Sequence, residues 1–121
     1  MSNKKTLVIG ASEDPSRYSY LAINNLRKKG HDVVAIGNRP GQVADVSFGK
    51  DKEPFEGIDT VTLYINPTRQ PEYYDYILGL HPQRIIFNPG TENPELEQLA
   101  SDKGIRTMEA CTLVLLSTGQ F

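Results

Sequence analysis

Five short runs of apolar residues are spaced along the chain, and polar segments separate them. Branched aliphatic residues dominate most of the runs, which lie at 7–9, 33–36, 60–65, 84–87 and 105–108. Strands of a parallel sheet are covered on both faces and therefore show unbroken apolar runs instead of strict alternation. The pattern predicts five buried parallel strands.

Between these runs, apolar residues recur at helical spacing. Helices are predicted from about Ser19 to residue 29, from near Thr68 to residue 80, over 94–103 and over 111–117. Asn93 and Pro94 form a strong helix start, because asparagine caps free N–H groups and proline suits the first helical position. Residues 42–57 contain helix-breaking Gly and Pro, so a loop with a short helical turn is expected there.

The alternation of strands and helices predicts an α/β fold. We expect a single domain over residues 1–121 with a Rossmann-like, doubly wound parallel five-stranded sheet. The predicted strand order is 3-2-1-4-5, with helices on both faces in three α/β/α layers. In this order the chain reverses direction between the first and fourth strands, and a ligand crevice opens at their carboxyl ends.

Charge and composition exclude several classes of function. The 121 residues include 13 basic and 15 acidic side chains, a net charge of −2, with no basic run that would follow nucleic acid phosphates. A single cysteine excludes an internal disulfide and a cysteine-based zinc cluster, and we expect no metal site. The polar stretch 1–6 does not resemble a signal peptide, and the longest apolar run, 113–116, is too short for a membrane span. A soluble cytoplasmic protein is expected.

The first predicted strand ends in a turn of small residues, Gly10, Ala11 and Ser12, with a helix shortly after. Small side chains let backbone N–H groups approach an anion, and the start of a helix adds partial positive charge. This turn is predicted to cradle phosphate groups of a cofactor. The full G-x-G-x-x-G pattern is absent, because none of the five residues after Gly10 is glycine.

The predicted topology also sorts the polar residues by sheet edge. Segments that leave a strand lie at the ligand edge; they are 10–17, 37–41, 66–69, 88–93 and 109–112. They are rich in Gly, Pro, Asn, Ser and Arg, which orient a ligand without reacting with it. His31 and His81 instead precede strands, so we expect both to be solvated loop residues at the opposite edge. A Ser-His-Asp or Cys-His relay is therefore not expected.

The end of the second predicted strand indicates the class of cofactor. NAD-binding domains usually place an acid there to hold ribose hydroxyls, whereas this chain has Gly37, Asn38 and Arg39. An arginine favours a ribose phosphate, as in coenzyme A (CoA) or NADP, unless Arg39 is an ordinary surface residue. Arg17 and Tyr18 are placed to reach a phosphate or to stack on adenine, although Tyr18 packing over the loop explains it equally well.

Several segments together resemble the small stand-alone CoA-binding proteins, which are similar to the N-terminal CoA-binding domain of the succinyl-CoA synthetase alpha subunit. They are VIGAS at 8–12, PSRYSY at 15–20, IGNRPG at 36–41, YINP at 64–67, IIFNPGTEN at 85–93 and EAC at 109–111. The resemblance covers nearly the whole chain, and the segments occur in the same order at matching spacing.

The resemblance assigns a role to each strand-end segment. It implies that Gly10, Ala11 and Ser12 wrap the CoA phosphates, and that the loop 38–41, with Asn38, Arg39 and Pro40, meets the adenosine 3′-phosphate end. It also implies that Ile65, Asn66 and Pro67 border the adenine or ribose, and that Asn88, Pro89 and Gly90 flank the pantetheine or pyrophosphate. In two respects the chain departs from the synthetase. Gln42 replaces a basic residue, and the phosphorylated histidine belongs to a second domain, so ligase activity is not expected.

The sequence thus predicts a protein that binds CoA or an acyl-CoA as a non-catalytic carrier, sensor or accessory protein, either a monomer or a homodimer. No catalytic residue is assigned, and neither nucleic acid nor a membrane is an expected partner. The alternatives are an NADP-binding module or oxidoreductase fragment, an acyl-CoA-processing enzyme that uses Cys111 beside Glu109, and an interaction module that pairs through the apolar helix at 113–116. Cys111 begins a predicted helix, a position that suits a reactive thiol, but a buried, inert cysteine fits it as well.

Overall fold

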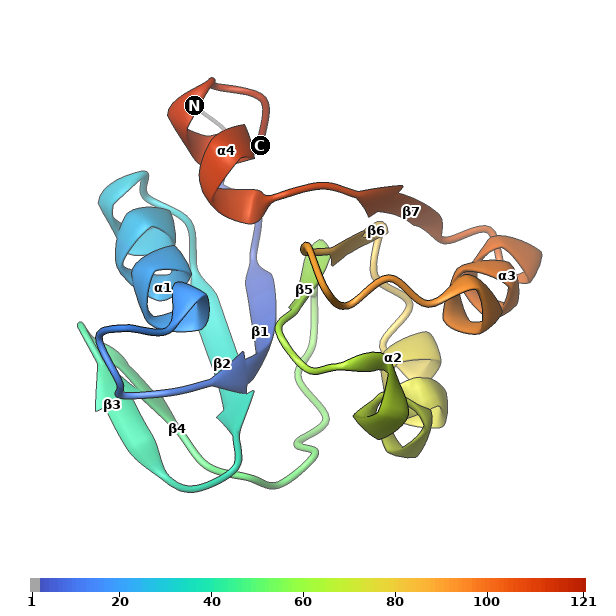
Figure 1. Ribbon diagram of the computed structural model, residues 1–121, viewed down its shortest axis with the longest axis horizontal. Helices are drawn as coiled ribbons and strands as arrows, with labels where there is room; N and C mark the ends of the chain where they lie inside the picture. The colour runs from blue at the N-terminus through green and yellow to red at the C-terminus, as the bar shows by residue number, and fades with distance from the viewer. Residues whose placement is uncertain (1–2) are drawn as a thin grey trace.

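The computed structural model describes residues 3–121 as an α/β fold with a parallel five-stranded sheet (Figure 1). The first two residues of the polar stretch 1–6 lie outside the described residues. In chain order the elements are β1 (Thr6–Ala11), α1 (Tyr18–Lys28), β2 (Val33–Gly37), β3 (Gly41–Val43), β4 (Val46–Phe48), β5 (Thr60–Leu63), the 3-10 turns η1 (Pro67–Arg69) and η2 (Pro71–Tyr73), α2 (Tyr74–Gly79), β6 (Arg84–Phe87), α3 (Pro94–Asp102), β7 (Arg106–Glu109) and α4 (Thr112–Ser117). The predicted fold class is confirmed.

The strand order is β2-β1-β5-β6-β7, so the predicted order 3-2-1-4-5 is wrong. The third of these five strands along the chain is β5. It pairs with β1, whereas the predicted order placed it on the far side of β2. The reason is that the hairpin after β2 covers the outer side of that strand: Gly37 donates its N–H to the carbonyl of Gly49 at 2.9 Å, and Ile36 bridges to Gly49. The chain then crosses to the other side of β1.

This order moves the point where the chain reverses direction. It lies between β1 and β5, not between the first and fourth strands as predicted. Figure 1 shows α1 and α4 on one side of the sheet and α2 and α3 on the other. Each side has its own apolar core, with Ile77 and Leu96 in one and Ile23 and Leu116 in the other. In open α/β sheets ligands bind at such a reversal point, so the carboxyl ends of β1 and β5 are where a ligand crevice is expected.

Residues 42–57 begin with a β-hairpin and not with a helical turn. Strands β3 and β4 pair antiparallel, and Val43, Val46 and Phe48 are buried against the sheet. Ala44 turns the chain with a positive φ of 54°. The strands are only three residues long, too short for their alternation to stand out in the sequence.

Two of the predicted helices illustrate how local signals act. Asn93 caps α3 as expected, because its Oδ1 accepts hydrogen bonds from the N–H groups of Glu95 and Leu96 at 3.1 and 3.2 Å. The helix predicted from Thr68 begins later, at Tyr74, after two 3-10 turns that each start at a proline. Proline supplies no N–H donor to a preceding turn, so the α-helix is delayed until both prolines are passed.

The two histidines lie at the edge of the sheet where strands begin. His31 was predicted to be solvated, and this was wrong: it is 5% exposed, its Nδ1 accepts the N–H of Lys4 at 3.0 Å, and its ring lies 5.0 Å from that of Phe121. Its burial follows from the packing of Phe121 over this edge, which a local pattern does not reveal. His81 is exposed as predicted, in a turn with a φ of 51°.

The buried His31 predicts a pH dependence of stability. Burial is the main cause that lowers the pKa of His31, and the charges of Lys4 and Arg84 add to it while Asp59 opposes it. Because the unfolded state binds the proton more readily, the free energy of unfolding should decrease as the pH falls below about 6.5. Urea unfolding between about pH 5.5 and 7.5 measures this, around the ordinary histidine pKa.

The His31→Gln variant keeps an acceptor and should show a flatter pH profile than the unaltered protein. The exposed His81→Asn serves as the matched control, since asparagine tolerates the positive φ at that position. An equally steep profile in His31→Gln and the unaltered protein would show that another group is responsible.

Across residues 3–121, none of the helices combines the length and apolar character that crossing a membrane requires.

Candidate ligand pocket at the carboxyl edge of β1 and β5

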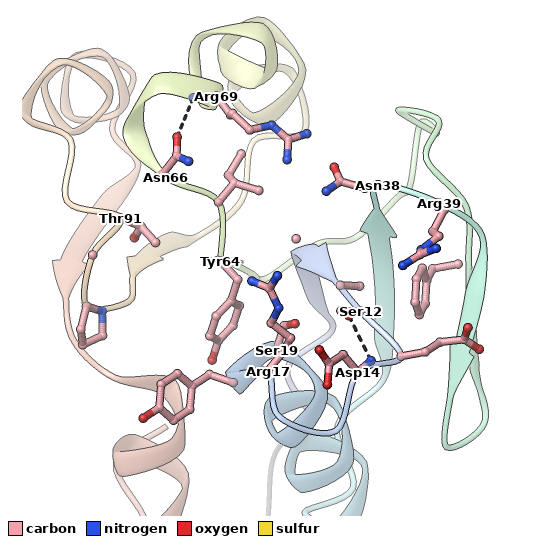
Figure 2. Close-up of a pocket in the computed structure, with 18 of the residues that line it drawn as sticks. Ser12, Asp14, Arg17, Ser19, Asn38, Arg39, Tyr64, Asn66, Arg69 and Thr91 are labelled. Carbon is pink, nitrogen blue, oxygen red and sulfur yellow. Dashed lines mark hydrogen bonds between the residues drawn. The ribbon is translucent and has the colours of Figure 1, made fainter.

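A pocket of about 990 Å³ lies at the reversal point, between the loops that follow β1, β2, β5 and β6 (Figure 2). Its volume is at the upper end of the range for small-molecule and cofactor sites. The lining residues are Gly10, Ala11, Ser12, Glu13, Asp14, Arg17, Tyr18, Ser19, Asn38, Arg39, Pro40, Phe48, Tyr64, Ile65, Asn66, Arg69, Pro89, Gly90 and Thr91. Segments far apart in the sequence thus meet at one sheet edge.

Gly10 allows the ends of β1 and β5 to approach closely. It has a φ of +100°, and a Cβ built on it would lie 2.8 Å from the backbone carbonyl carbon and oxygen of Tyr64. The pairing of β1 with β2 also shifts register here, since Ile9 pairs with Ile36 but Ala11 pairs with Gly37. The positive φ and the close contact with Tyr64 both require a glycine at this position. The resulting turn brings the backbone of Gly10, Ala11 and Ser12 to the pocket surface.

The loop after this turn is ordered by its own hydrogen bonds. Ser12 Oγ accepts from the N–H of Asp14 at 3.0 Å, and Asp14 Oδ1 accepts from the N–H and hydroxyl of Ser16 at 3.0 and 2.7 Å. The hydrogen bonds from Ser16 hold the pKa of the Asp14 carboxyl below its usual value. Helix α1 then starts without a side-chain cap and without an acidic residue in its first turn. Its N-terminus favours an anion.

Glu13 connects this loop to the hairpin. Its Oε2 accepts the N–H of Gln42 at 2.9 Å, and its side chain lies so close to Gly41 that a Cβ there would be 2.7 Å from Glu13 Cγ. The side chain of Gln42 donates to the carbonyl of Ala44 at 3.0 Å, within the hairpin turn. Gln42 does not line the pocket, whereas Arg39 from the preceding loop does.

All but two of the residues predicted from the sequence to bind the cofactor line this pocket. They are Gly10, Ala11, Ser12, Arg17, Tyr18, Asn38, Arg39, Pro40, Ile65, Asn66, Pro89 and Gly90. Pro67 is not a lining residue; it begins the turn η1 behind Asn66. The structure therefore brings together residues of four predicted loops.

Asn88 is the second predicted residue outside the pocket lining. It is 3% exposed, and its amide donates to Thr62 Oγ1 at 2.6 Å and to the Leu63 carbonyl at 2.8 Å. Its Oδ1 accepts the N–H of Thr112 at 2.9 Å. These contacts join β5, β6 and the start of α4 behind the pocket. Its polar atoms are thus engaged within the fold.

The structure adds lining residues that were not predicted: Glu13, Asp14, Ser19, Phe48, Tyr64, Arg69 and Thr91. Arg69 and Thr91 belong to segments that leave strands, so their position at the ligand edge could have identified them. Glu13, Asp14 and Ser19 flank the predicted cradle. Phe48 reaches the pocket only because of the hairpin, which the sequence did not reveal.

Tyr64 contributes its ring to the pocket and buries its hydroxyl. The hydroxyl oxygen lies near Thr112 and Thr62 but has no hydrogen bond of normal geometry among the described residues. Burial is the main cause that raises the pKa of Tyr64 to about 12. The phenol therefore stays protonated at neutral pH.

Cys111 and the last helix lie beside the pocket. Cys111 is a free, partly buried residue at the N-terminal end of α4, and it is not one of the pocket-lining residues. In α4, Leu115 and Leu116 are buried in the core that includes α1, while Val114 is 54% exposed. The apolar face of this helix is therefore largely used within the fold.

Fold and pocket together define a Rossmann-like α/β domain with a pocket at the reversal point of its sheet. The chain belongs to the CoA binding domain family, whose model matches residues 4–117. This finding confirms the family resemblance seen in the sequence. A search of curated proteins gave no match.

Solved structures show the same architecture. A crystal structure of an uncharacterized protein is 48% identical, with a TM-score of 0.96 and 100% of both chains covered. A protein from Thermus thermophilus is 23% identical with a TM-score of 0.82, covering 98% of this chain and 91% of its own. A hypothetical protein from Pyrococcus horikoshii OT3 is 22% identical with a TM-score of 0.86, covering 96% and 83%. The last two show likeness of fold alone.

Proposed function

We propose that the chain binds CoA or an acyl-CoA in this pocket and acts as a carrier, sensor or accessory protein without catalysis. The observation that carries the proposal is the loop after β2, where Arg39 and Asn38 line the pocket and no acid is present. Membership of the CoA binding domain family supports it independently. A guanidinium at this place suits a ribose phosphate, which CoA carries on its 3′ oxygen.

The acids of the pocket do not replace the missing one. Glu13 accepts a hydrogen bond from the hairpin backbone, and Asp14 is engaged by Ser16. Both carboxylates organise the loop around the cradle, and both follow β1 and not β2, where NAD-binding domains place their acid. This favours a phosphorylated ribose over the ribose of NAD.

The proposed placement of the cofactor follows the loops. The backbone of Gly10, Ala11 and Ser12, with the start of α1, would hold the pyrophosphate. The loop with Asn38, Arg39 and Pro40 would hold the 3′-phosphate, and the segment with Ile65 and Asn66, supported by Pro67, would border the adenine. Pro89 and Gly90 would flank the pantetheine, with Asn88 supporting them from behind.

The titratable side chains around the pocket support a binding role. The pKa of Tyr64 is raised to about 12, and that of Asp14 lies below its usual value. Neither is poised near neutral pH, where a general acid or base works best. Both histidines lie at the opposite edge of the sheet.

Calorimetry with CoA, dephospho-CoA, NADP and NAD tests the proposal. We expect CoA to bind, dephospho-CoA to bind more weakly, and NAD to bind least. A protein that binds NADP and ignores CoA would contradict the proposal and favour the reductase alternative.

Replacing Arg39 by alanine should weaken CoA binding by about 1.5–3 kcal/mol, the scale of a charge-assisted hydrogen bond. Dephospho-CoA lacks the phosphate that Arg39 is proposed to contact, so its affinity should change little. The measurement is the dissociation constant of both ligands for the variant and the unaltered protein. Equal losses for the two ligands would show that Arg39 does not contact the 3′-phosphate.

A further inference from the structure

Arg69 lines the pocket, although no binding role was predicted for it individually. It lies in η1, directly after β5, and Figure 2 shows its guanidinium turned toward the pocket from the side opposite Arg17. Arg39 points into the same space from a third loop. Within residues 3–121, no side-chain hydrogen bond to a protein group is found for any of these three arginines. Arg69 Nη2 lies 3.9 Å from Glu72 Oε1.

The backbone that carries Arg69 is held firmly on both sides. Asn66 Oδ1 accepts the N–H of Arg69 at 3.2 Å. The next residue, Gln70, is fully buried and donates from its Nε2 to the carbonyls of Ile65 at 3.0 Å and Thr91 at 2.7 Å. Because Ile65 and Thr91 belong to different loops that line the pocket, the Gln70 amide fixes the two loops together.

The remaining contact of Gln70 completes this network. Its Oε1 accepts from Asn93 Nδ2 at 2.9 Å, and Asn93 is itself the cap of α3. A fully satisfied buried amide network holds one geometry, because any displacement leaves polar groups without partners. Arg69 therefore extends from a rigid turn, and less ordering is needed when it binds a ligand.

The Arg69 guanidinium is available to an anion. Its side chain is 41% exposed, and an exposed pair at 3.9 Å with Glu72 contributes little. Guanidinium presents paired N–H donors that match phosphate oxygens, which makes arginine well suited to this role. The backbone of Gly10, Ala11 and Ser12, which forms the cradle, lines the same pocket as Arg17 and Arg69.

We propose that Arg69 and Arg17 hold a diphosphate from opposite sides of the cradle, while Arg39 serves a separate monophosphate. This inference rests on the proposed function and assigns Arg69 to the CoA pyrophosphate. The pocket thereby selects a ligand that carries a diphosphate and a distant phosphate, as CoA does.

The test compares CoA with dephospho-CoA in Arg69→Gln, Arg39→Gln and the control Arg106→Gln. Arg106 is exposed at the start of β7, at the opposite edge of the sheet. Arg69→Gln should lower the affinity for both ligands by about tenfold or more, as expected for the loss of one charge-assisted contact. The ratio of the two affinities should stay as in the unaltered protein, whereas Arg39→Gln should bring this ratio close to one.

Three outcomes would overturn the assignment. In the first, Arg69→Gln binds both ligands as tightly as Arg106→Gln does. In the second, Arg69→Gln abolishes the preference for CoA over dephospho-CoA, which would place Arg69 at the 3′-phosphate. In the third, the unaltered protein fails to bind CoA, and the proposed function then fails together with this inference.

Arg69→Lys separates a phosphate contact from a structural role. It keeps the positive charge but not the paired donors, so its affinity should fall between that of the unaltered protein and that of Arg69→Gln. Thermal unfolding of all variants without ligand should match the control. A loss of affinity that follows a loss of thermal stability, with no recovery in Arg69→Lys, would count against the proposal.

Discussion

Gly10→Ala should lower the free energy of unfolding by about 2–5 kcal/mol and remove measurable CoA binding. The φ of +100° disfavours any side chain, which costs about 1–2 kcal/mol. The added Cβ would also lie 2.8 Å from the Tyr64 backbone, and forcing atoms into a packed site costs about 1–3 kcal/mol more. The strand ends would have to separate, and the cradle would open with them.

Gly30→Ala is the matched control for this prediction. Gly30 has a φ of +84° but nothing within 4 Å of an added Cβ, so only the backbone cost applies. Urea unfolding should therefore show a loss of about 1–2 kcal/mol for Gly30→Ala, the conformational cost alone. Similar losses in the two variants would show that the close approach of β1 and β5 does not demand glycine.

Asn88→Ala should destabilise the fold by about 2–4 kcal/mol, because buried groups left without partners are costly. The change removes the donor to Thr62 and Leu63 and the acceptor of the Thr112 N–H, all of them buried contacts. Since Asn88 does not line the pocket, CoA affinity of the protein that remains folded should decrease less than in Arg39→Ala.

Two further variants check the Asn88 assignment. Asn25→Ala removes an exposed side chain that donates to Leu21 within α1, and it should change stability by about 0.5 kcal/mol or less. Asn88→Asp keeps the acceptor for the Thr112 N–H but loses the donors to Thr62 and Leu63. Its free energy of unfolding should therefore be lower than that of the unaltered protein. If Asn88→Ala unfolds at the same urea concentration as the unaltered protein, the amide does not hold β5, β6 and α4 together.

Local patterns predicted the strands and most helices well, because each depends on nearby residues. The buried run 84–87 became β6 at the predicted bounds, and Asn93 with Pro94 started α3 as expected. Strand order could not be predicted from local patterns, because it depends on whether the outer edge of β2 remains free to pair with another strand. The hairpin after β2 covers that edge through Gly49, and its three-residue strands leave almost no periodic signal.

The site was predictable to the extent that it follows from the ends of strands. Loops that leave parallel strands gather at one edge whatever their order, so the cradle and Arg39 are found in one pocket despite the wrong strand order. Asn88 and Asn38 show the limit of this reasoning. Both follow a strand, but only the structure reveals that Asn88 is buried and engaged by three partners while Asn38 faces the pocket.

Tyr64 and His31 show a second limit. Each lies where the sequence suggests an ordinary loop or strand residue, and each is buried through contacts with distant parts of the chain. The Tyr64 hydroxyl lies near Thr112, and His31 packs on Phe121. Their pKa shifts result from this burial, which no local motif encodes.

The most direct test of the central claim is an NMR titration of backbone amides with CoA and then with dephospho-CoA. With CoA, the largest shifts should occur at Gly10, Ala11, Ser12, Arg39 and Gly90, at the carboxyl edge of β1 and β5. With dephospho-CoA, the shifts of the cradle should persist while that of Arg39 should largely disappear. Shifts centred on the opposite edge, around His31 and Phe121, or no shifts at saturating CoA, would contradict the account.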